Sequence, residues 1–237
     1  MKEKVQIYIL TGFPGAGKST WAREQVSKDP GIMIVNNDKL REMVFGKYEY
    51  RHNTEDVIRQ VAELAVFVCV FNGYDVIVDE TNLSRVKREQ IVLNIRERTR
   101  CFFDKGKLLF NYVSFTPSIE HLKRRMSENR GRGEDNWIRV YNEMLEAYEP
   151  VTKEEKEELG ISGHTVIGGI GDKKPKVEDW LLYQRIYCSR CNVPVLAPQN
   201  GICFMCNKNI AQTENWVEIA ANTHITNCPH CKHSFCE

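Results

Sequence analysis

Residues 12–19, GFPGAGKS, combine glycines, a lysine and a serine at a spacing that can hold a chain of phosphates. Glycines allow backbone N–H groups to turn inward around phosphate oxygens, and Lys18 brings a positive charge to them. The Ser19 hydroxyl can bind Mg²⁺, and a helix that begins here directs its positive end at the anion. The motif therefore predicts a loop that binds ATP with Mg²⁺. Its expected members are Gly12, Gly15, Ala16, Gly17, Lys18, Ser19 and Thr20.

A carboxylate and an arginine follow in the segment NNDKLR, residues 36–41. Asp38 comes just after an apolar run, where a carboxylate can take the proton from an acceptor hydroxyl. Arg41 lies one helical turn further on the same face, so it could hold an acceptor phosphate or orient Asp38. The alternative is that Asp38 only caps a helix and Arg41 is solvated.

A second pair of acids ends the apolar run in VIVDETN, residues 76–82. A carboxylate at the end of a buried strand is typical of the Mg²⁺ site of nucleotide-binding proteins. Asp79 and Glu80 are adjacent and point to opposite sides of an extended chain, so only one can face the metal. The pattern leaves open which one does. Thr81 and Asn82 could contact the acceptor, or the segment could be a simple turn.

Five basic residues lie in LKRRMSENRGRGEDNW, residues 122–137, and glycines flank Arg132. This pattern predicts a helix that leads into a basic lid over the transferring phosphate. Arg132 or Arg130 would then offset the charge that develops during transfer. A solvated charged face is the alternative.

Seven of the nine cysteines lie between Cys188 and Cys236, mostly as C-x-x-C pairs. In a reducing compartment such pairs indicate metal sites rather than disulfides. Eleven residues separate Cys188/Cys191 from Cys203/Cys206, a spacing that predicts four-thiolate coordination of Zn²⁺.

A second zinc site is expected at the C-terminal end. Its candidate ligands are Cys228, Cys231, Cys236 and His224, with His233 as the alternative to His224. In a competing arrangement, Cys228 and Cys231 join Cys188 and Cys191, and the middle pair belongs to another site. Such a small module needs the metal because it cannot build a large core.

Strands and helices alternate in front of this cysteine-rich part. The alternation predicts an α/β fold with a mainly parallel sheet, helices on both faces and ligands at the carboxyl edge. The expected strands are 5–10, 32–35, 74–79 and 108–115. The expected helices are 18–28, 38–45, 54–72, 84–99, 117–129 and 136–148.

Three segments follow from this pattern. Residues 1–150 form the nucleotide-binding domain and residues 178–237 the zinc module. Residues 151–177 form a linker, or a short helix and a loop, because 160–176 carry five glycines and a proline.

The charge balance, 33 Lys and Arg against 32 Asp and Glu, gives no global field that would attract nucleic acid. Nucleic acid, the expected acceptor, must therefore bind through local patches. No apolar run has the length of a membrane span, and the first residues match no signal peptide. We therefore expect a cytoplasmic protein, in the host cytoplasm if the protein is viral. The sequence does not predict an oligomeric state.

Four segments, GFPGAGKSTWAR, PGIMIVNNDKLR, DETNL and RGRG, together resemble the kinase domain of bacteriophage polynucleotide 5′-kinase and its relatives. The resemblance covers residues 4–150. It implies that Lys18 and Ser19 bind ATP and Mg²⁺ and that Asp38 activates a polynucleotide 5′-hydroxyl. It further implies that Arg41 binds the acceptor's 3′-phosphate and that Arg132, or Arg130, contacts the donor phosphates.

The D-x-T-N pattern of that family selects Asp79 for the metal, whereas some relatives would select Glu80. The phosphatase motif D-x-D-G-T of the phage enzyme is absent, so removal of 3′ phosphates is not expected.

The first hypothesis is thus a polynucleotide 5′-kinase that binds DNA or RNA. The alternatives are a kinase for a hydroxymethylated pyrimidine in DNA, a small-molecule kinase, and a nucleotide-switched binding module. The zinc module either binds nucleic acid or is structural. Its candidate contacts for nucleic acid are Arg185, Arg190, Lys208, Phe204 and Trp216.

Overall fold

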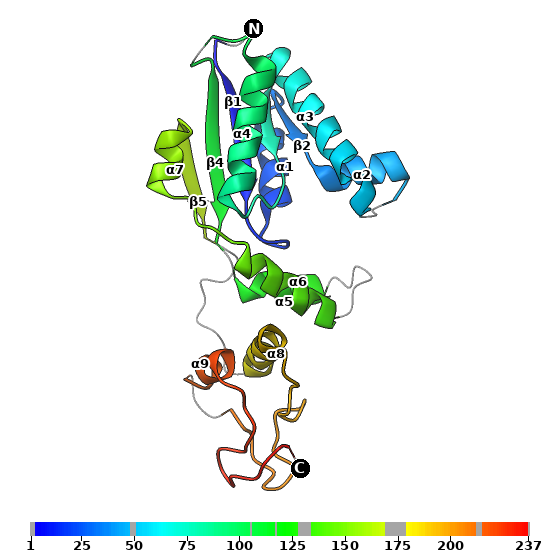
Figure 1. The fold of residues 1–237 in the computed structure, drawn as a ribbon, viewed down its shortest axis with the longest axis vertical. Coiled ribbons are helices and arrows are strands. Elements are labelled where there is room, and N and C mark those ends of the chain that lie inside the picture. Colours follow the sequence, from blue (N-terminus) through cyan, green and yellow to red (C-terminus); the bar gives the residue numbers. More distant parts are fainter. Residues whose placement is uncertain are drawn as a thin grey trace. The chain divides into compact units, whose positions relative to one another are not determined.

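The computed structural model describes residues 3–47, 51–104, 106–116, 118–127, 134–168, 179–211 and 215–236. The chain forms two compact units (Figure 1). The first unit comprises Met1–His121 and Ala147–Ile170, and the second comprises Leu122–Glu146 and Gly171–Glu237. Residues 122–146 thus group with the C-terminal residues, whereas the sequence predicts them in the nucleotide-binding domain.

The first unit is built on a five-stranded sheet in the order β2-β3-β1-β4-β5, and all neighbouring strands are parallel. Its strands are β1 Val5–Thr11, β2 Ile32–Val35, β3 Asp75–Val78, β4 Leu108–Phe115 and β5 Gly163–Ile167. All carboxyl ends therefore meet at one edge, where β2, β3 and β1 lie side by side. This confirms the predicted α/β fold class.

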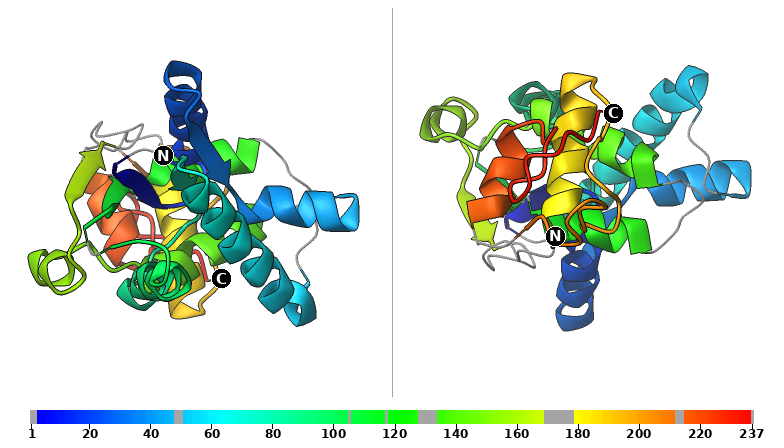
Figure 2. Two further views of the ribbon diagram at one scale, coloured as in Figure 1. Left: turned by 90° about the horizontal axis from the view of Figure 1, so that it is seen from above. Right: turned by 90° about the horizontal axis from the view of Figure 1, so that it is seen from below.

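Helices cover both faces of the sheet. They are α1 Lys18–Lys28, α2 Asn37–Phe45, α3 Glu55–Phe71, α4 Arg85–Thr99 and α7 Lys153–Glu158, with a 3₁₀ turn η1 at His52–Thr54. Val70 of α3 and Val92 of α4 pack in one core with Ile7 of β1. Ala22 of α1 packs in another core with Leu10 of β1. The end-on views accordingly show α1 on one side of the sheet and α3 and α4 on the other (Figure 2).

Local side chains explain where several helices begin. The Asn36 side chain accepts a hydrogen bond of 2.9 Å from the backbone N–H of Lys39 and so caps α2. Ser84 caps α4 and Thr152 caps α7 in the same way. These bonds satisfy N–H groups that have no partner in the first turn of a helix.

The segment 151–177, predicted to be a linker or a short helix and a loop, contains the short helix α7 and also strand β5. β5 pairs with β4 from Asn111↔Gly163 to Phe115↔Ile167. A Cβ on Gly163 would lie only 2.6 Å from Oδ1 of Asn111, so glycine permits this close approach. The glycine that suggested a loop therefore marks the beginning of an edge strand.

The second unit contains α6 Glu134–Glu146, α8 Trp180–Cys191 and α9 Asn215–Asn222, while α5 Ile119–Ser127 spans the boundary between the units. Trp180, Ile210, Val217 and Ile225 form its core together with buried cysteines. Among the described residues, no helix has the length and apolar character needed to cross a membrane.

Candidate functional site: a phosphate loop, a carboxylate edge and a four-cysteine cluster

The glycine-rich loop joins β1 to α1 at the carboxyl edge of the sheet, as the motif predicts. Gly17 precedes α1 with a φ of 95°, a left-handed conformation that favours glycine. Gly12 has a φ of 151°, and a Cβ at this position would lie 2.8 Å from Cβ of Phe115. The loop can take this path only because both positions are glycine.

Lys18 lies folded over this loop. Its Nζ donates hydrogen bonds to the carbonyl oxygens of Gly12, at 2.8 Å, and Phe13, at 2.9 Å. The side chain is buried, with 8% of the residue exposed. A buried positive charge held against the loop is what the binding of phosphate oxygens requires.

Asp79 directly follows the last residue of β3, and its carboxylate is buried beside the end of β2. Asn36 Nδ2 donates to Asp79 Oδ2 at 2.9 Å and to the Asp79 carbonyl at 2.8 Å. The other carboxylate oxygen, Oδ1, is buried and accepts no hydrogen bond from the described residues. A buried anionic oxygen without a donor is costly unless a cation balances it, and Mg²⁺ prefers such oxygen ligands. The residues at this edge therefore fit a bound Mg²⁺.

Glu80 is directed at α2 instead. Its Oε1 accepts a hydrogen bond of 2.7 Å from the backbone N–H of Asn37, the first residue of that helix. Burial raises the pKa of Glu80 to about 7; the bond from Asn37 opposes this shift, and the charges of Asp38 and Asp79 add to it. Of the two acids, only Asp79 keeps a buried oxygen open.

Asp38 and Arg41 contact each other on α2. Arg41 Nη1 donates to Asp38 Oδ1 at 2.5 Å, and the Asp38 side chain remains 57% exposed. Asn36, not Asp38, caps the helix, and Arg41 is buried rather than solvated. The alternative interpretation of these two residues therefore does not describe this structure.

Glu55, at the start of α3, holds Arg41 from the other side. Arg41 Nε and Nη2 donate to its two carboxylate oxygens at 2.9 and 2.5 Å. The hydrogen bonds that Arg41 donates to Glu55 raise the pKa of Arg41 further above its usual range, although burial opposes this. Sequence reasoning missed Glu55 in this role because it lies 14 positions beyond Arg41 in the chain, on another helix. Its only signal is an acid in the first turn of α3.

Thr81 and Asn82, predicted as acceptor contacts, brace the phosphate loop. The Thr81 carbonyl accepts a bond of 2.9 Å from the Gly12 N–H. Asn82 is buried, and its Nδ2 donates to the Leu10 carbonyl at 2.8 Å. The Asn82 carbonyl accepts a bond of 2.8 Å from Thr11 Oγ1. The Asn82 amide is thus turned toward β1, and its contact with an acceptor stays a prediction.

The predicted lid arginines, Arg130 and Arg132, lie outside the described residues.

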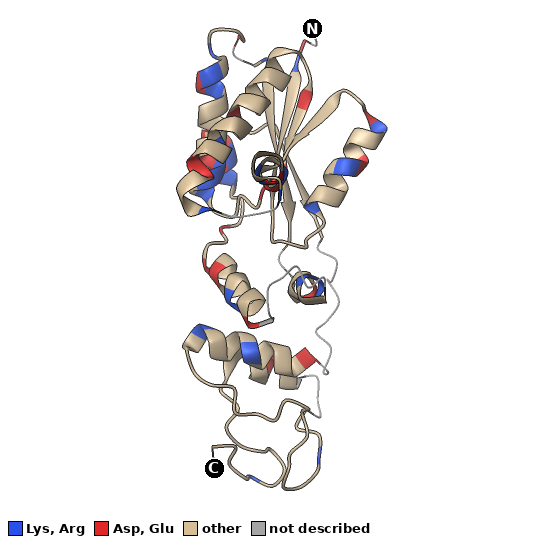
Figure 3. Cartoon of the chain, turned by 90° about the vertical axis from the view of Figure 1, so that its right-hand side faces the viewer, with Lys and Arg blue, Asp and Glu red and all other residues tan. Residues whose placement is uncertain are grey.

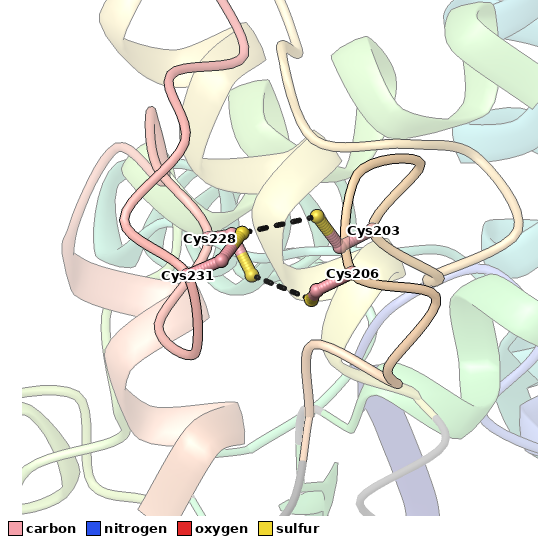
Figure 4. A group of neighbouring side chains, drawn as sticks. All are labelled: Cys203, Cys206, Cys228 and Cys231. Carbon is pink, nitrogen blue, oxygen red and sulfur yellow. Dashed lines mark hydrogen bonds between the residues drawn. The ribbon is translucent and has the colours of Figure 1, made fainter.

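Four cysteines come together in the second unit: Cys203, Cys206, Cys228 and Cys231 (Figure 4). Their sulfur atoms all lie within 4.8 Å of one another. The Sγ atoms of Cys203 and Cys231 are 3.7 Å apart, and so are those of Cys206 and Cys228. Tetrahedral coordination of Zn²⁺ with bonds of about 2.3 Å places sulfur atoms about 3.8 Å apart. These two distances match that spacing, and the four thiols fit a bound Zn²⁺.

Two turns of the same construction supply these sulfurs. In the first knuckle, residues 202–210, Cys203 N–H donates to the Lys208 carbonyl at 3.0 Å. In the second knuckle, residues 227–235, Cys228 N–H donates to the His233 carbonyl at 2.9 Å. An antiparallel bridge closes each knuckle, Ile202↔Asn209 and Asn227↔Ser234. Burial opposes ionisation of Cys228, but bonds from the backbone N–H groups of Cys231 and His230 lower its pKa to about 7.

This grouping differs from both pairings expected from the sequence. Cys188 and Cys191 lie in the last turn of α8 and not in a knuckle. Cys188 Sγ instead accepts a hydrogen bond of 3.4 Å from the buried Gln184. A C-x-x-C inside a helix lacks the tight turn that folds a knuckle around the metal.

The remaining predicted ligands also lie elsewhere. His224 donates to the Pro194 carbonyl at 2.8 Å, the His233 ring packs against Phe204, and Cys236 is exposed. Among the described residues, the four-cysteine cluster is the one group of three or more possible ligands.

Comparison with known proteins places this geometry in a family. Residues 7–151 match the model of a family described as an AAA domain. A solved chain of the Pnkp1/Rnl/Hen1 complex aligns over 53% of this chain and 40% of its own length, with 28% identity and a TM-score of 0.45. The chain thus spans less than half of that protein.

Two further solved structures align over more of the chain. A fungal RNA kinase aligns over 78% of this chain and 83% of its own, with 12% identity and a TM-score of 0.54. A gluconokinase from Sinorhizobium meliloti 1021 aligns over 80% of this chain and 93% of its own, with 17% identity and a TM-score of 0.39. The likeness to the fungal RNA kinase is one of fold alone.

Proposed function

The chain belongs to the AAA domain family, and from that premise we propose that it is a kinase that uses ATP and Mg²⁺. The acceptor that we propose is a hydroxyl of a nucleic acid, first of all a polynucleotide 5′-hydroxyl. The observation that carries the proposal is Asp38, an exposed carboxylate that the buried Arg41 holds. Asp38 lies just after β2, at the carboxyl edge of the sheet where the glycine-rich loop also lies. A protein that only binds ATP has no need of such a base.

In this mechanism the loop N–H groups and Lys18 hold the triphosphate. Ser19 and Asp79 would hold Mg²⁺, which offsets negative charge on the phosphates when bound. Asp38 accepts the proton of the acceptor hydroxyl, whose oxygen forms a bond to the γ-phosphorus while the bond to ADP breaks. Arg41 keeps Asp38 in position.

The choice of a nucleic acid is supported by the sequence motifs. Residues 12–23 and 30–41 resemble the corresponding segments of polynucleotide 5′-kinases. A cysteine-rich module on the same chain also favours a large acceptor over a small one. We further propose that Cys203, Cys206, Cys228 and Cys231 bind one Zn²⁺, which would supply the second unit with the cross-link that its small core needs.

Transfer from γ-labelled ATP to a panel of acceptors tests the proposal. The panel contains 5′-hydroxyl DNA, 5′-hydroxyl RNA, duplex DNA with hydroxymethyluracil, and nucleosides. We expect label on a strand end. Label on the modified base or on a nucleoside alone would establish one of the alternative kinases. ATP hydrolysis that needs no acceptor, without any labelled product, would indicate a nucleotide-switched binding module.

Asp38→Asn tests the assignment of the base. We expect kcat to fall by about 10²- to 10⁴-fold while the affinity for ATP stays the same. Glu42→Gln is the matched control, because Glu42 lies on the same helix and pairs only with the exposed Lys39 among the described residues. Full activity of Asp38→Asn on every acceptor would rule out this role.

A further inference from the structure

We propose that the two zinc knuckles form a binding surface for single-stranded nucleic acid. On this surface a base stacks on Phe204, and Lys208 and Lys232 contact phosphates. The inference deepens the proposed function and rests on it for the identity of the strand as acceptor. Binding itself can be measured independently of phosphoryl transfer.

Phe204 is an exposed aromatic ring with a fixed support. It lies between two metal-binding cysteines of the first knuckle and is 62% exposed. Its ring packs edge-on against His233 of the second knuckle, with centroids 4.9 Å apart at 89°. The centroid of the Phe235 ring lies 6.2 Å from the centroid of the Phe204 ring. A ring that is held from the side while it faces solvent can stack on a base with little loss of side-chain entropy.

The neighbours of Phe204 are also apolar and exposed. Met205 is 62% exposed, and Ile202 is 39% exposed. A turn that only had to hold a metal would have no reason to present three apolar side chains to water. Several exposed apolar residues in one turn favour an interaction surface.

The charges near these exposed apolar residues favour an anionic partner. Residues 192–211 and 223–236, all of them described, contain no Asp or Glu. Lys208 and Lys232, one in each knuckle, are both exposed. Figure 3 accordingly shows basic but no acidic positions on the loops at the C-terminal end. An aromatic ring beside lysines is the combination that binds single strands without sequence preference.

Hydrogen bonds fix the two knuckles to each other. His230 Nε2 of the second knuckle donates to the Asn209 carbonyl of the first at 2.8 Å. Together with the bonds within each knuckle, this contact sets the surface before a ligand arrives. A preformed surface gives up less entropy on binding.

Fluorescence anisotropy with labelled oligo(dT) and oligo(U) strands of about 15 nucleotides tests the inference without ATP. In the full chain, Phe204→Ala should weaken binding by about 5- to 150-fold, the loss expected for one stacked base. Lys208→Gln combined with Lys232→Gln should lower the slope of log K against log[salt] by about 1.4. Ile219→Ala, an exposed apolar residue on α9, is the control and should bind as the unmodified protein does.

Bound zinc is measured in each variant, so that unfolding of the module is recognised. Unchanged strand binding by a zinc-loaded Phe204→Ala overturns the inference. Anionic vesicles serve as a second probe. A Phe204→Ala variant that loses binding to these vesicles but keeps strand binding also overturns the inference. If strands bind in a Phe204-dependent way but receive no phosphate, the proposed function fails and the surface stands. If strands are phosphorylated and Phe204→Ala binds them normally, the surface fails alone.

Discussion

Arg41 connects two acids of opposite character. Asp38 is exposed and free to meet an acceptor, whereas Glu55 is partly buried and makes two hydrogen bonds to the same guanidinium. A guanidinium held at two points has a fixed orientation, and the third nitrogen then determines where the Asp38 carboxylate lies. Glu55 is therefore a positioning residue for the proposed base.

Glu55→Gln should lower kcat by about 10-fold while the KM for ATP stays near its original value, because a displaced Arg41 no longer aligns Asp38. Steady-state kinetics on the best acceptor of the panel measures this. The control is Asp56→Asn, one residue further along α3, since Asp56 is 83% exposed and contacts only Arg59 among the described residues. Equal losses in both variants would mean that Glu55 has only a general effect on α3.

Glu80 makes the stability of the protein depend on pH. A glutamate in the unfolded chain titrates near 4.3, whereas the pKa of Glu80 in the folded chain is about 7. Between these values the folded state holds the additional proton, so the free energy of unfolding falls as the pH rises from about 4.3 to 7. This contribution is fully present below the unfolded pKa and amounts to about 4 kcal/mol at most.

Glu80→Gln should therefore flatten the dependence of stability on pH. Urea denaturation at several values between pH 5 and 8 measures the slope for both proteins. Glu42→Gln, an exposed change on α2, should keep the original slope. A Glu80→Gln variant with an unchanged slope would mean that another group causes the dependence.

At the scale of elements, α4 and α7 are joined by an ion pair without solvent contact. Arg88 of α4 and Glu155 of α7 both have fully buried side chains and form two hydrogen bonds of 2.8 and 2.7 Å. Arg88 Nη1 also donates to the carbonyls of Asn82 and Leu83, at 3.2 and 3.0 Å. The pair therefore supports the segment that braces the phosphate loop.

Arg88→Met should reduce the free energy of unfolding by about 3–5 kcal/mol, because it leaves the Glu155 carboxylate buried without its cation. The double variant Arg88→Met, Glu155→Met should be more stable than the single variant, since it removes the unpaired charge as well. Urea denaturation compares the three proteins. A double variant less stable than Arg88→Met would contradict this account.

The sequence predicts most elements of the first unit because their signals are local. Four of the five strands and helices α1 to α4 lie within two residues of the expected ranges, since apolar runs, caps and glycines mark their ends. β5 was not predicted, because a short edge strand is stabilised by pairing with β4 and two of its five residues are exposed. The role of Glu55 and the grouping of the four cysteines were not predicted for the same reason, because both depend on contacts between distant parts of the chain.

At the scale of the whole molecule, the cysteine cluster makes metal content a direct test of the ligand set. We expect one zinc ion per chain, measured by mass spectrometry of the purified protein. Cys206→Ser should lose the metal, whereas Cys191→Ser, at an exposed position on α8, should keep it. Two ions per chain, or loss of zinc from Cys191→Ser, would favour the pairing expected from the sequence.

The four-cysteine cluster also joins the two ends of the loop that contains α9, since Cys206 precedes this helix and Cys228 follows it. A ligand that binds only the folded state stabilises that state by mass action. With the proposed zinc site, each tenfold fall in free zinc lowers the stability of the second unit by about 1.4 kcal/mol. The fraction of chains in which this unit is folded would then depend on the concentration of free zinc in the cell, even when the amount of protein stays the same.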